Sequence, residues 1–251
     1  MRIIIVDNYS TLSKKSALMI ASQIILKPDS VIGFATGDTP LGTYKELISL
    51  YNDQTLDFSE ITSFNLDEYF GLDPKNPQSY HHYMMNNLFN HINISPEKIY
   101  IPSGLAKDIQ TECDNYEKTI NAFGGIDLQL LGIGRNGHIG FNEPDIKFEA
   151  RTHIVELDED TINANSRFFN SKEEVPTQAI SMGIKTIMHA KKIVLLASGK
   201  EKANAIYNTV YGKITPEVPA SVLQLHPDVT LIVDKDAASM FKEIERRSLS
   251  V

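Results

Sequence analysis

Short runs of apolar residues alternate with longer amphipathic segments along the whole chain. The apolar runs have the length of buried strands; they are Ile3–Val6, Val31–Ala35, Ile61–Asn65, Leu128–Leu131, Ile193–Ala197 and Val229–Val233. Near-continuous Val, Ile and Leu content is typical of strands that are covered on both faces, as in a parallel sheet. The segments between them have the apolar spacing of helices; they are Leu12–Ile25, Leu41–Tyr51, Tyr80–Ile92, Asp108–Phe123 and Lys200–Tyr211.

This alternation predicts βαβ units in an α/β fold. We expect one doubly wound, mostly parallel, Rossmann-like sheet with helices on both faces. No repeat, low-complexity tract or linker divides the 251 residues, so a single domain over residues 1–251 is expected. In such a sheet, ligands bind at the carboxyl ends of the strands, where the chain leaves each strand for its helix.

Composition and charge narrow the classes of function. The hydrophobic fraction of 42% is ordinary for a globular protein. The net charge of −8, without any run of Lys or Arg, argues against a nucleic-acid partner. The single cysteine, Cys113, cannot form an internal disulfide, which fits a reducing compartment. No segment has the pattern of a membrane span or a signal peptide, so we expect a cytoplasmic protein that does not associate with membranes.

A turn with the sequence Thr36-Gly37-Asp38-Thr39-Pro40 follows the second apolar run. Free backbone N–H groups at the start of a helix, together with threonine hydroxyls, can bind one phosphate. The turn is equally compatible with a plain connection in which Thr39 is the N-cap and Pro40 the first helical residue. The carboxylate of Asp38 disfavours a phosphate unless it points away. The Gly-Lys-Ser/Thr of a Walker loop is absent.

Two adjacent carboxylates, Asp67 and Glu68, directly follow the third apolar run. A carboxylate at the carboxyl end of a strand is presented to a ligand, and partial burial raises its pKa toward the range of a general base. The alternative is a solvated pair in which Asp67 caps a turn.

A glycine-rich segment follows the fourth apolar run and contains Asn136, His138 and Glu143. Histidine is the side chain best suited to move protons near neutral pH, and a carboxylate partner can fix its tautomer. The segment also has a G-x-G-x-x-G pattern, but no helix is predicted after it, which argues against a dinucleotide. His138 and Glu143 alone are too few ligands for a metal. We therefore expect acid–base chemistry without a metal.

Two basic residues, Arg167 and Lys202, complete the candidate site. Taken singly, each has the ordinary interpretation of a solvated surface charge. Lys202, however, lies one turn into the helix after the fifth apolar run, where its amine can reach a bound phosphate. Arg167 lies within the polar stretch 158–174, which is compatible with a mobile lid and equally with a surface helix.

The candidate segments occur in one order along nearly the whole chain: Ala35-Thr36-Gly37-x-Thr39-Pro40, Phe64-Asn65-x-Asp67-Glu68-Tyr69, Pro77-x-Ser79-Tyr80, Gly134-x-x-Gly137-His138-Ile139-x-Phe141-Asn142-Glu143-Pro144, Asn165-Ser166-Arg167-Phe168-Phe169 and Leu225-His226-Pro227. In this order they resemble the glucosamine-6-phosphate deaminase family, in its short bacterial form. The resemblance implies the conversion of glucosamine 6-phosphate and water to fructose 6-phosphate and ammonia, without a metal or organic cofactor.

The resemblance also implies roles for the residues. His138, oriented by Glu143 and Asn136, would open the sugar ring, and Asp67 would remove the C2 proton. The residues implied for the substrate phosphate are Thr36, Gly37, Asp38, Thr39, Arg167 and Lys202.

This chain departs from the family pattern at several positions. Many members have Ser or Gly in place of Asp38, and some have Asp in place of Asn136. The larger hexameric members that respond to N-acetylglucosamine 6-phosphate have basic residues where this chain has His153 and Val155. We therefore expect no such activation, and a monomer or a small homo-oligomer.

Three alternatives remain open at this point. A galactosamine-6-phosphate deaminase differs in the orientation of one hydroxyl, which the sequence does not show. A 6-phosphogluconolactonase or a sugar-phosphate isomerase of the same broad fold is disfavoured, because a lactonase needs no base at C2. A sugar-phosphate sensor of a transcription regulator would have a degraded acid–base set, whereas Asp67, His138 and Glu143 are all present.

Overall fold

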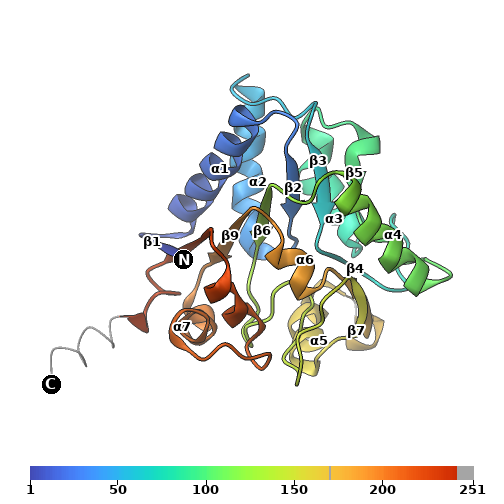
Figure 1. Cartoon of the computed structure of the whole chain (residues 1–251), viewed down its shortest axis with the longest axis vertical. Coiled ribbons are helices and arrows are strands. Elements are labelled where there is room, and N and C mark those ends of the chain that lie inside the picture. Colours follow the sequence, from blue (N-terminus) through green and yellow to red (C-terminus); the bar gives the residue numbers. More distant parts are fainter. Residues whose placement is uncertain (170, 242–251) are drawn as a thin grey trace, which may run out of the picture.

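The computed structural model describes residues 1–169 and 171–241, and its centre is a parallel sheet (Figure 1). Its strand order is β1-β10-β9-β6-β2-β3-β5, and every neighbouring pair is parallel. The strands are β1 (Arg2–Val6), β2 (Val31–Phe34), β3 (Thr62–Asn65), β5 (Ile99–Tyr100), β6 (Leu128–Leu131), β9 (Lys192–Ala197) and β10 (Val229–Asp234). All six apolar runs are therefore confirmed as strands of one parallel sheet.

A small antiparallel sheet lies beside the central one and was not predicted. It has the order β4-β8-β7 and consists of β4 (Asp67–Tyr69), β7 (His153–Glu156) and β8 (Gln178–Ser181). β4 begins two residues after β3 ends, so the chain passes almost directly from one sheet to the other.

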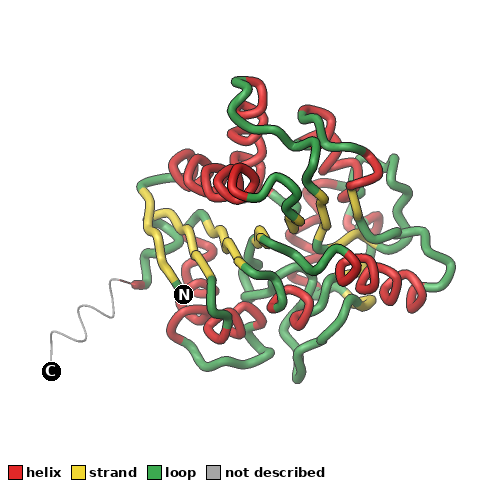
Figure 2. The backbone as a smooth tube through the Cα atoms, turned by 45° about the horizontal axis from the view of Figure 1, so that its top comes forward, coloured by secondary structure: helices red, strands yellow, loops and turns green. Residues whose placement is uncertain are grey.

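Helices cover both faces of the central sheet, as Figure 2 shows. On one face lie α1 (Tyr9–Leu26), α2 (Asp38–Asn52) and α3 (Tyr80–Asn87), and on the other α4 (Ile109–Ala122), α6 (Ile184–Met188) and α7 (Ala203–Tyr211). The remaining helices are α5 (Glu159–Asn165) and the short 3-10 helices η1 (Phe89–His91), η2 (Pro96–Lys98), η3 (Ser166–Phe168), η4 (Lys172–Glu174), η5 (Lys200–Lys202) and η6 (Pro219–Leu225). Among the described residues, no helix has the length and apolar character needed to cross a membrane.

Each face of the sheet has its own hydrophobic core, because side chains alternate between the two faces of a strand. In β6, Leu130 packs with α1, α2 and α3, whereas the next residue, Leu131, packs with α4, α6 and α7. Both leucines are fully buried. This double coverage explains why the strands have no polar face in the sequence.

The chain reverses its direction across the sheet between β2 and β6. From β2 it proceeds to β3 and β5 on one side, then returns to β6 on the other side of β2, and continues to β9 and β10. The loops after β2 and β6 therefore leave the sheet in opposite directions and border a crevice, which is where ligands bind in open α/β sheets. The turn at residues 36–39 and the segment at 132–143 are these two loops.

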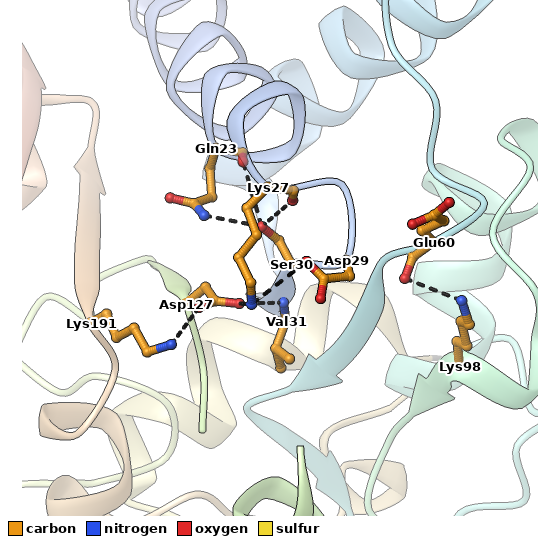
Figure 3. A network of polar contacts seen from close by, with 9 residues as sticks. All are labelled: Gln23, Lys27, Asp29, Ser30, Val31, Glu60, Lys98, Asp127 and Lys191. Carbon is orange, nitrogen blue, oxygen red and sulfur yellow. Dashed lines mark hydrogen bonds and ion pairs between the residues drawn. The ribbon is translucent and has the colours of Figure 1, made fainter. Parts of the chain in front are cut away.

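At the opposite edge, a buried carboxylate joins the amino ends of β2 and β6 (Figure 3). Asp127 Oδ2 accepts hydrogen bonds from Val31 N at 2.8 Å and from Lys27 Nζ at 2.6 Å, and Oδ1 accepts one from Lys191 Nζ at 2.8 Å. Burial alone would raise the pKa of Asp127, but the hydrogen bonds from both lysines outweigh it and lower the pKa below its usual value. The carboxylate is thus charged at neutral pH.

We predict that Asp127→Asn lowers the free energy of unfolding by about 1–3 kcal/mol at pH 7, the range for hydrogen bonds to a charged group. Because the folded-state pKa of Asp127 is lowered, its contribution is present above the ordinary value of 3.8 and is lost as the pH falls through the folded-state pKa. The difference between the two proteins in urea denaturation should therefore shrink below that pH. Asp29→Asn is the control, because Asp29 is 72% exposed and 3.9 Å from Lys27. Equal stabilities of the wild type and Asp127→Asn at pH 7 would contradict the prediction.

Candidate active site

The turn after β2 starts helix α2 earlier than the sequence suggested. The N-cap is Gly37, with φ +95°, and Asp38 is the first helical residue. The alternative in which Thr39 is the N-cap and Pro40 the first helical residue is therefore wrong. Glycine adopts this positive φ without strain, and an acidic residue in the first turn is favoured by the helix dipole.

Tyrosines hold the carbonyl groups of this turn. Tyr83 Oη donates to Gly37 O at 2.6 Å, and Tyr9 Oη lies 3.0 Å from Asp38 O and 3.1 Å from Thr39 O. These bonds fix the position of the turn, and the first backbone N–H groups of the helix, which have no acceptor within the helix, can then meet an anion.

Basic side chains from three other segments gather near this turn. Arg167, in η3, forms an ion pair with the carboxylate of Asp38. Lys202, the last residue of η5, donates from Nζ to Ile133 O at 2.7 Å. Burial lowers the pKa of Lys202, and the charges of Arg135 and Arg167 lower it further. The structure therefore brings Asp38, Arg167 and Lys202 into electrostatic range of one another.

Arg135 is a basic residue of this group that the sequence interpretation did not assign. It is exposed and lies in the loop after β6, between Gly134 and Asn136. Its charge acts on Lys202. The sequence did contain a signal, because Arg135 lies inside the glycine-rich loop at the carboxyl end of a strand, where ligands bind.

Asp67 is a buried carboxylate at the start of β4, with 5% of its surface exposed. Burial is the main cause that raises its pKa to about 8, and the charge of Glu68 adds to the effect. No hydrogen bond to its carboxylate is found in the part of the chain that the structure describes. Asp67 lies within a strand, so the interpretation as a solvated turn cap is wrong. A carboxylate without compensating donors is a strong candidate for a general base.

The neighbouring carboxylate, Glu68, has a structural role. It accepts hydrogen bonds from the backbone N–H groups of Tyr69 at 2.9 Å, Tyr80 at 2.8 Å and His81 at 2.8 Å. Glu68 thereby ties β4 to the first turn of α3, where an acidic group is favoured by the helix dipole. Glu68 thus accepts three backbone hydrogen bonds, whereas the carboxylate of Asp67 accepts none from the described residues.

His138, Glu143 and Asn136 form one hydrogen-bonded group. His138 Nδ1 lies 3.0 Å from Glu143 Oε2, and Asn136 Nδ2 donates to the same oxygen at 2.8 Å. Thr161 Oγ1, from α5, donates to Glu143 Oε1 at 2.5 Å. Burial would raise the pKa of Glu143, but these hydrogen bonds outweigh it and lower the pKa. A charged Glu143 accepts the Nδ1 proton of His138, which leaves Nε2 as the atom that can exchange a proton with a ligand.

The glycines of the loop make room for these side chains. A Cβ at Gly134 would lie 2.4 Å from Cε1 of the His138 ring, so the ring occupies the space that a side chain would take. At Gly140 the backbone has φ +58°, and a Cβ would lie 3.1 Å from Ser181 Oγ and 3.6 Å from Asp67 Oδ2. The loop therefore passes directly over the carboxylate of Asp67.

The small antiparallel sheet is what brings this loop to Asp67. Ser181 of β8 pairs with Asp67 of β4, and Ser181 Oγ accepts a hydrogen bond from Phe141 N at 3.0 Å. Tyr80 makes a second link, because its hydroxyl is hydrogen-bonded to Thr36 and its environment includes the charge of Asp67. Ser181, Tyr80 and Thr161 were not assigned from the sequence, although Tyr80 lies within one of the matching motifs.

The described residues, 1–169 and 171–241, contain no group of three or more His, Cys, Asp and Glu side chains that could hold a metal ion. Cys113 is buried in α4, and burial raises its pKa to about 11, so it remains a protonated thiol. The crevice holds a buried carboxylate and a carboxylate-bound imidazole, which can transfer protons, beside cationic side chains that could meet a phosphate.

Comparisons with known proteins identify the family of the chain. A model of the family of glucosamine-6-phosphate isomerases and 6-phosphogluconolactonases matches residues 9–232. A glucosamine-6-phosphate deaminase of Clostridium botulinum is 63% identical over 242 residues, which cover 96% of this chain and 99% of that protein. The corresponding protein of Clostridioides difficile is 61% identical over 239 residues, which cover 95% of this chain and 96% of that protein.

Solved structures extend the comparison to the fold. A monomeric glucosamine-6-phosphate deaminase superposes with a TM-score of 0.93 at 49% identity, covering 95% of this chain and 99% of that one. A 6-phosphogluconolactonase from Thermotoga maritima has a TM-score of 0.75 at 18% identity, covering 93% of this chain and 99% of that one, and shares the fold alone. The chain belongs to the family of glucosamine-6-phosphate isomerases and 6-phosphogluconolactonases, and within it to the glucosamine-6-phosphate deaminases.

Proposed function

We propose that this protein is an enzyme that converts D-glucosamine 6-phosphate and water to D-fructose 6-phosphate and ammonia, in the catabolism of amino sugars. The observation that carries this function is the buried carboxylate of Asp67, which has a pKa raised to about 8 and lies under Gly140 of the loop that holds His138. A lactonase needs to activate water at a carbonyl and has no use for a base at C2.

The reaction begins with the opening of the sugar ring. A proton must leave the anomeric hydroxyl and another must reach the ring oxygen, and His138 Nε2 is the atom for this exchange. Glu143 accepts the Nδ1 proton of His138 and stabilises the imidazolium that forms, while Asn136 holds Glu143 in place. The product of this step is the open-chain aldehyde.

The aldehyde makes the proton on C2 acidic, and Asp67 removes it to give an enolamine. Reprotonation at C1 gives an imine at C2, and water then hydrolyses the imine to the ketone and ammonia. Burial without hydrogen-bond donors makes Asp67 a stronger base than an ordinary aspartate. The protein's own groups thus supply each proton transfer, and we propose that neither a metal nor an organic cofactor takes part.

The phosphate would bind between the start of α2 and the basic side chains. The proposed groups are the backbone from Thr36 to Thr39 (Thr36, Gly37, Asp38 and Thr39), with the side chains of Arg167 and Lys202. Binding energy from the phosphate, which does not react, holds C1 and C2 against Asp67.

We predict that Arg135 strengthens phosphate binding through its charge. Arg135→Gln should raise KM for glucosamine 6-phosphate by about two- to fivefold, because an exposed charge contributes up to about 1 kcal/mol. The effect should decline as salt is added, since salt screens exposed charges. Arg151→Gln removes the same charge from an arginine that pairs with Asp114, and is the control. A salt-independent KM effect, or an equal effect in Arg151→Gln, would argue against the prediction.

We further propose a cytoplasmic enzyme in which residues 1–251 act as one domain, that is a monomer or a small homo-oligomer and that binds no nucleic acid. At the positions where the large members of the family have basic residues, β7 has His153 and Val155. We therefore predict hyperbolic saturation by glucosamine 6-phosphate that N-acetylglucosamine 6-phosphate leaves unchanged. Initial-rate curves with and without the N-acetyl sugar measure this, and a sigmoidal curve that the sugar converts to a hyperbola would refute it.

A panel of substrates tests the choice among related activities. Purified enzyme is assayed for kcat/KM with glucosamine 6-phosphate, galactosamine 6-phosphate and 6-phosphogluconolactone under identical conditions. The proposed function requires the glucosamine compound to have the highest value. A higher value for galactosamine 6-phosphate would keep the mechanism and change the substrate, whereas turnover of the lactone alone would exclude the deaminase.

A further inference from the structure

The turn at residues 36–39, proposed above to bind the phosphate, contains a carboxylate that forms an ion pair with one of the proposed phosphate-binding cations. Asp38 is the first residue of α2, directly after the N-cap Gly37, and its Oδ2 forms an ion pair with Arg167 of η3. The two residues are 129 positions apart in the sequence. Their side chains are 55% and 61% exposed, so both are open to exchange with a ligand.

Asp38 and the substrate phosphate would therefore use the same guanidinium. Arg167 is the arginine proposed above for the phosphate, and Asp38 lies on the turn whose backbone N–H groups are proposed to meet it. Two anions at one helix start repel each other, and a guanidinium that pairs with a carboxylate offers fewer donors to a phosphate. A close approach of the phosphate thus favours the breaking of the pair.

The local charge supports this exchange. Arg135, Arg167 and Lys202 are cationic, and Asp38 and Glu201 are the acids that act on Lys202. Lys202 Nζ donates a hydrogen bond to Ile133 O at 2.7 Å, whereas Arg167 forms its ion pair with the carboxylate of Asp38. Asp38 is thus placed as a counter-ion for Arg167.

We propose that Asp38 lowers the affinity of the site for its phosphorylated substrate, because the substrate's phosphate must displace the Asp38 carboxylate from Arg167. The inference rests on the proposed function, which assigns Arg167 to the phosphate. It makes Asp38 a determinant of KM. The opposite role, in which Asp38 positions Arg167 for the phosphate, predicts an effect of the opposite sign.

The test measures the Kd of inorganic phosphate by calorimetry, which requires no turnover, and KM for glucosamine 6-phosphate in parallel. Asp38→Asn keeps the shape of the side chain and removes its charge. We expect both constants to fall by the same factor, about three- to fivefold, which is the range for one exposed ion pair. Asp53→Asn is the control for net charge, because Asp53 is exposed and caps the other end of α2.

A double-mutant cycle with Arg167→Met separates the ion pair from a general change in charge. In the Arg167→Met background, Asp38→Asn should give a smaller gain in phosphate affinity, because only the repulsion between the Asp38 carboxylate and the phosphate remains to be relieved. A Kd for phosphate that is unchanged or higher in Asp38→Asn would overturn the proposal, and so would an equal gain with and without Arg167. If Asp38→Asn tightens phosphate binding while no variant or wild-type protein releases ammonia, the counter-ion role stands and the proposed function fails.

Discussion

Asp67→Asn should lower kcat for the deamination of glucosamine 6-phosphate by about 10³-fold or more, within the range contributed by a positioned general base. The amide has the size of the carboxylate but cannot accept the C2 proton. Because Asp67 accepts no hydrogen bond from the described part of the chain, the replacement breaks no existing hydrogen bond. Binding of the substrate, measured by calorimetry, should be retained. A variant that keeps more than a tenth of the wild-type kcat would remove Asp67 from the mechanism.

The pH dependence gives a second test of the same residue. A base must be deprotonated to act, and burial raises the pKa of Asp67 to about 8. The acid limb of kcat/KM for the wild-type enzyme should therefore lie near that pKa, well above the value of 3.8 for an ordinary aspartate. Activity should rise as the pH increases through this range. A limb near pH 4 would contradict a buried base.

The same pKa shift predicts that the base destabilises the fold. For an acid whose folded-state pKa is raised, stability is greatest below the unfolded-state pKa and falls as the pH rises toward the folded-state pKa. Asp67→Asn, which cannot ionise, should therefore have a higher melting temperature than the wild type at pH 7. Glu68→Gln is the contrast: burial raises the pKa of Glu68 too, but three backbone N–H groups donate to its carboxylate, and the glutamine side chain would turn its own N–H donors toward at least one of them, so this variant should be less stable than the wild type. The opposite order of stabilities would contradict this assignment.

His138→Asn should have the second largest effect, a loss of about 10²- to 10³-fold in kcat, because ring opening would lack its proton carrier. The phosphate contacts proposed above do not involve His138, so KM should change much less than kcat. The open-chain alcohol analogue of the substrate, which needs no ring opening, should bind to the variant and to the wild type with similar affinity. A variant whose loss lies mainly in KM would place His138 in binding instead.

Glu143→Gln tests how His138 is held. A glutamine amide can donate to Nδ1, and the imidazole would then hold its proton on Nε2, the wrong tautomer for a base at that atom. We expect a loss in kcat comparable with that of His138→Asn and no further loss in the double variant, since the two residues act as a unit. Thr161→Val is the matched control, because it removes the hydrogen bond to Glu143 Oε1 and leaves Oε2, the oxygen that His138 contacts, unchanged. An additive double variant would argue against a common step.

The hydrophobic pattern predicted six strands of the central sheet, since the inner strands are buried on both faces. It missed β5, which is two residues long and only partly buried. The small antiparallel sheet escaped prediction because β4 is three residues long and β7 is only partly buried, so neither has a clear period. The helix-start prediction for α2 failed at Gly37. Glycine at a positive φ serves as an N-cap without a side-chain hydrogen bond, whereas the sequence rule favours a threonine that can make one.

The sequence indicated the site residues as separate clusters, but it did not predict which clusters lie next to one another in the fold. Asp67 and the loop of His138 meet because Ser181 of β8 pairs with Asp67 and accepts a hydrogen bond from Phe141 N. Likewise, the sequence raised the charge of Asp38 as a difficulty for a phosphate but did not indicate its partner. The ion pair with Arg167 depends on how η3 packs near the start of α2, which no local pattern encodes.

Measuring both products of the wild-type enzyme with glucosamine 6-phosphate is the most direct test of the proposed deamination. Ammonia and fructose 6-phosphate are quantified in the same reaction, beside Asp67→Asn at equal concentration. Equimolar ammonia and fructose 6-phosphate from the wild type, with almost none from the variant, is the predicted result. A folded wild-type protein that binds glucosamine 6-phosphate and releases no ammonia would contradict the proposed function.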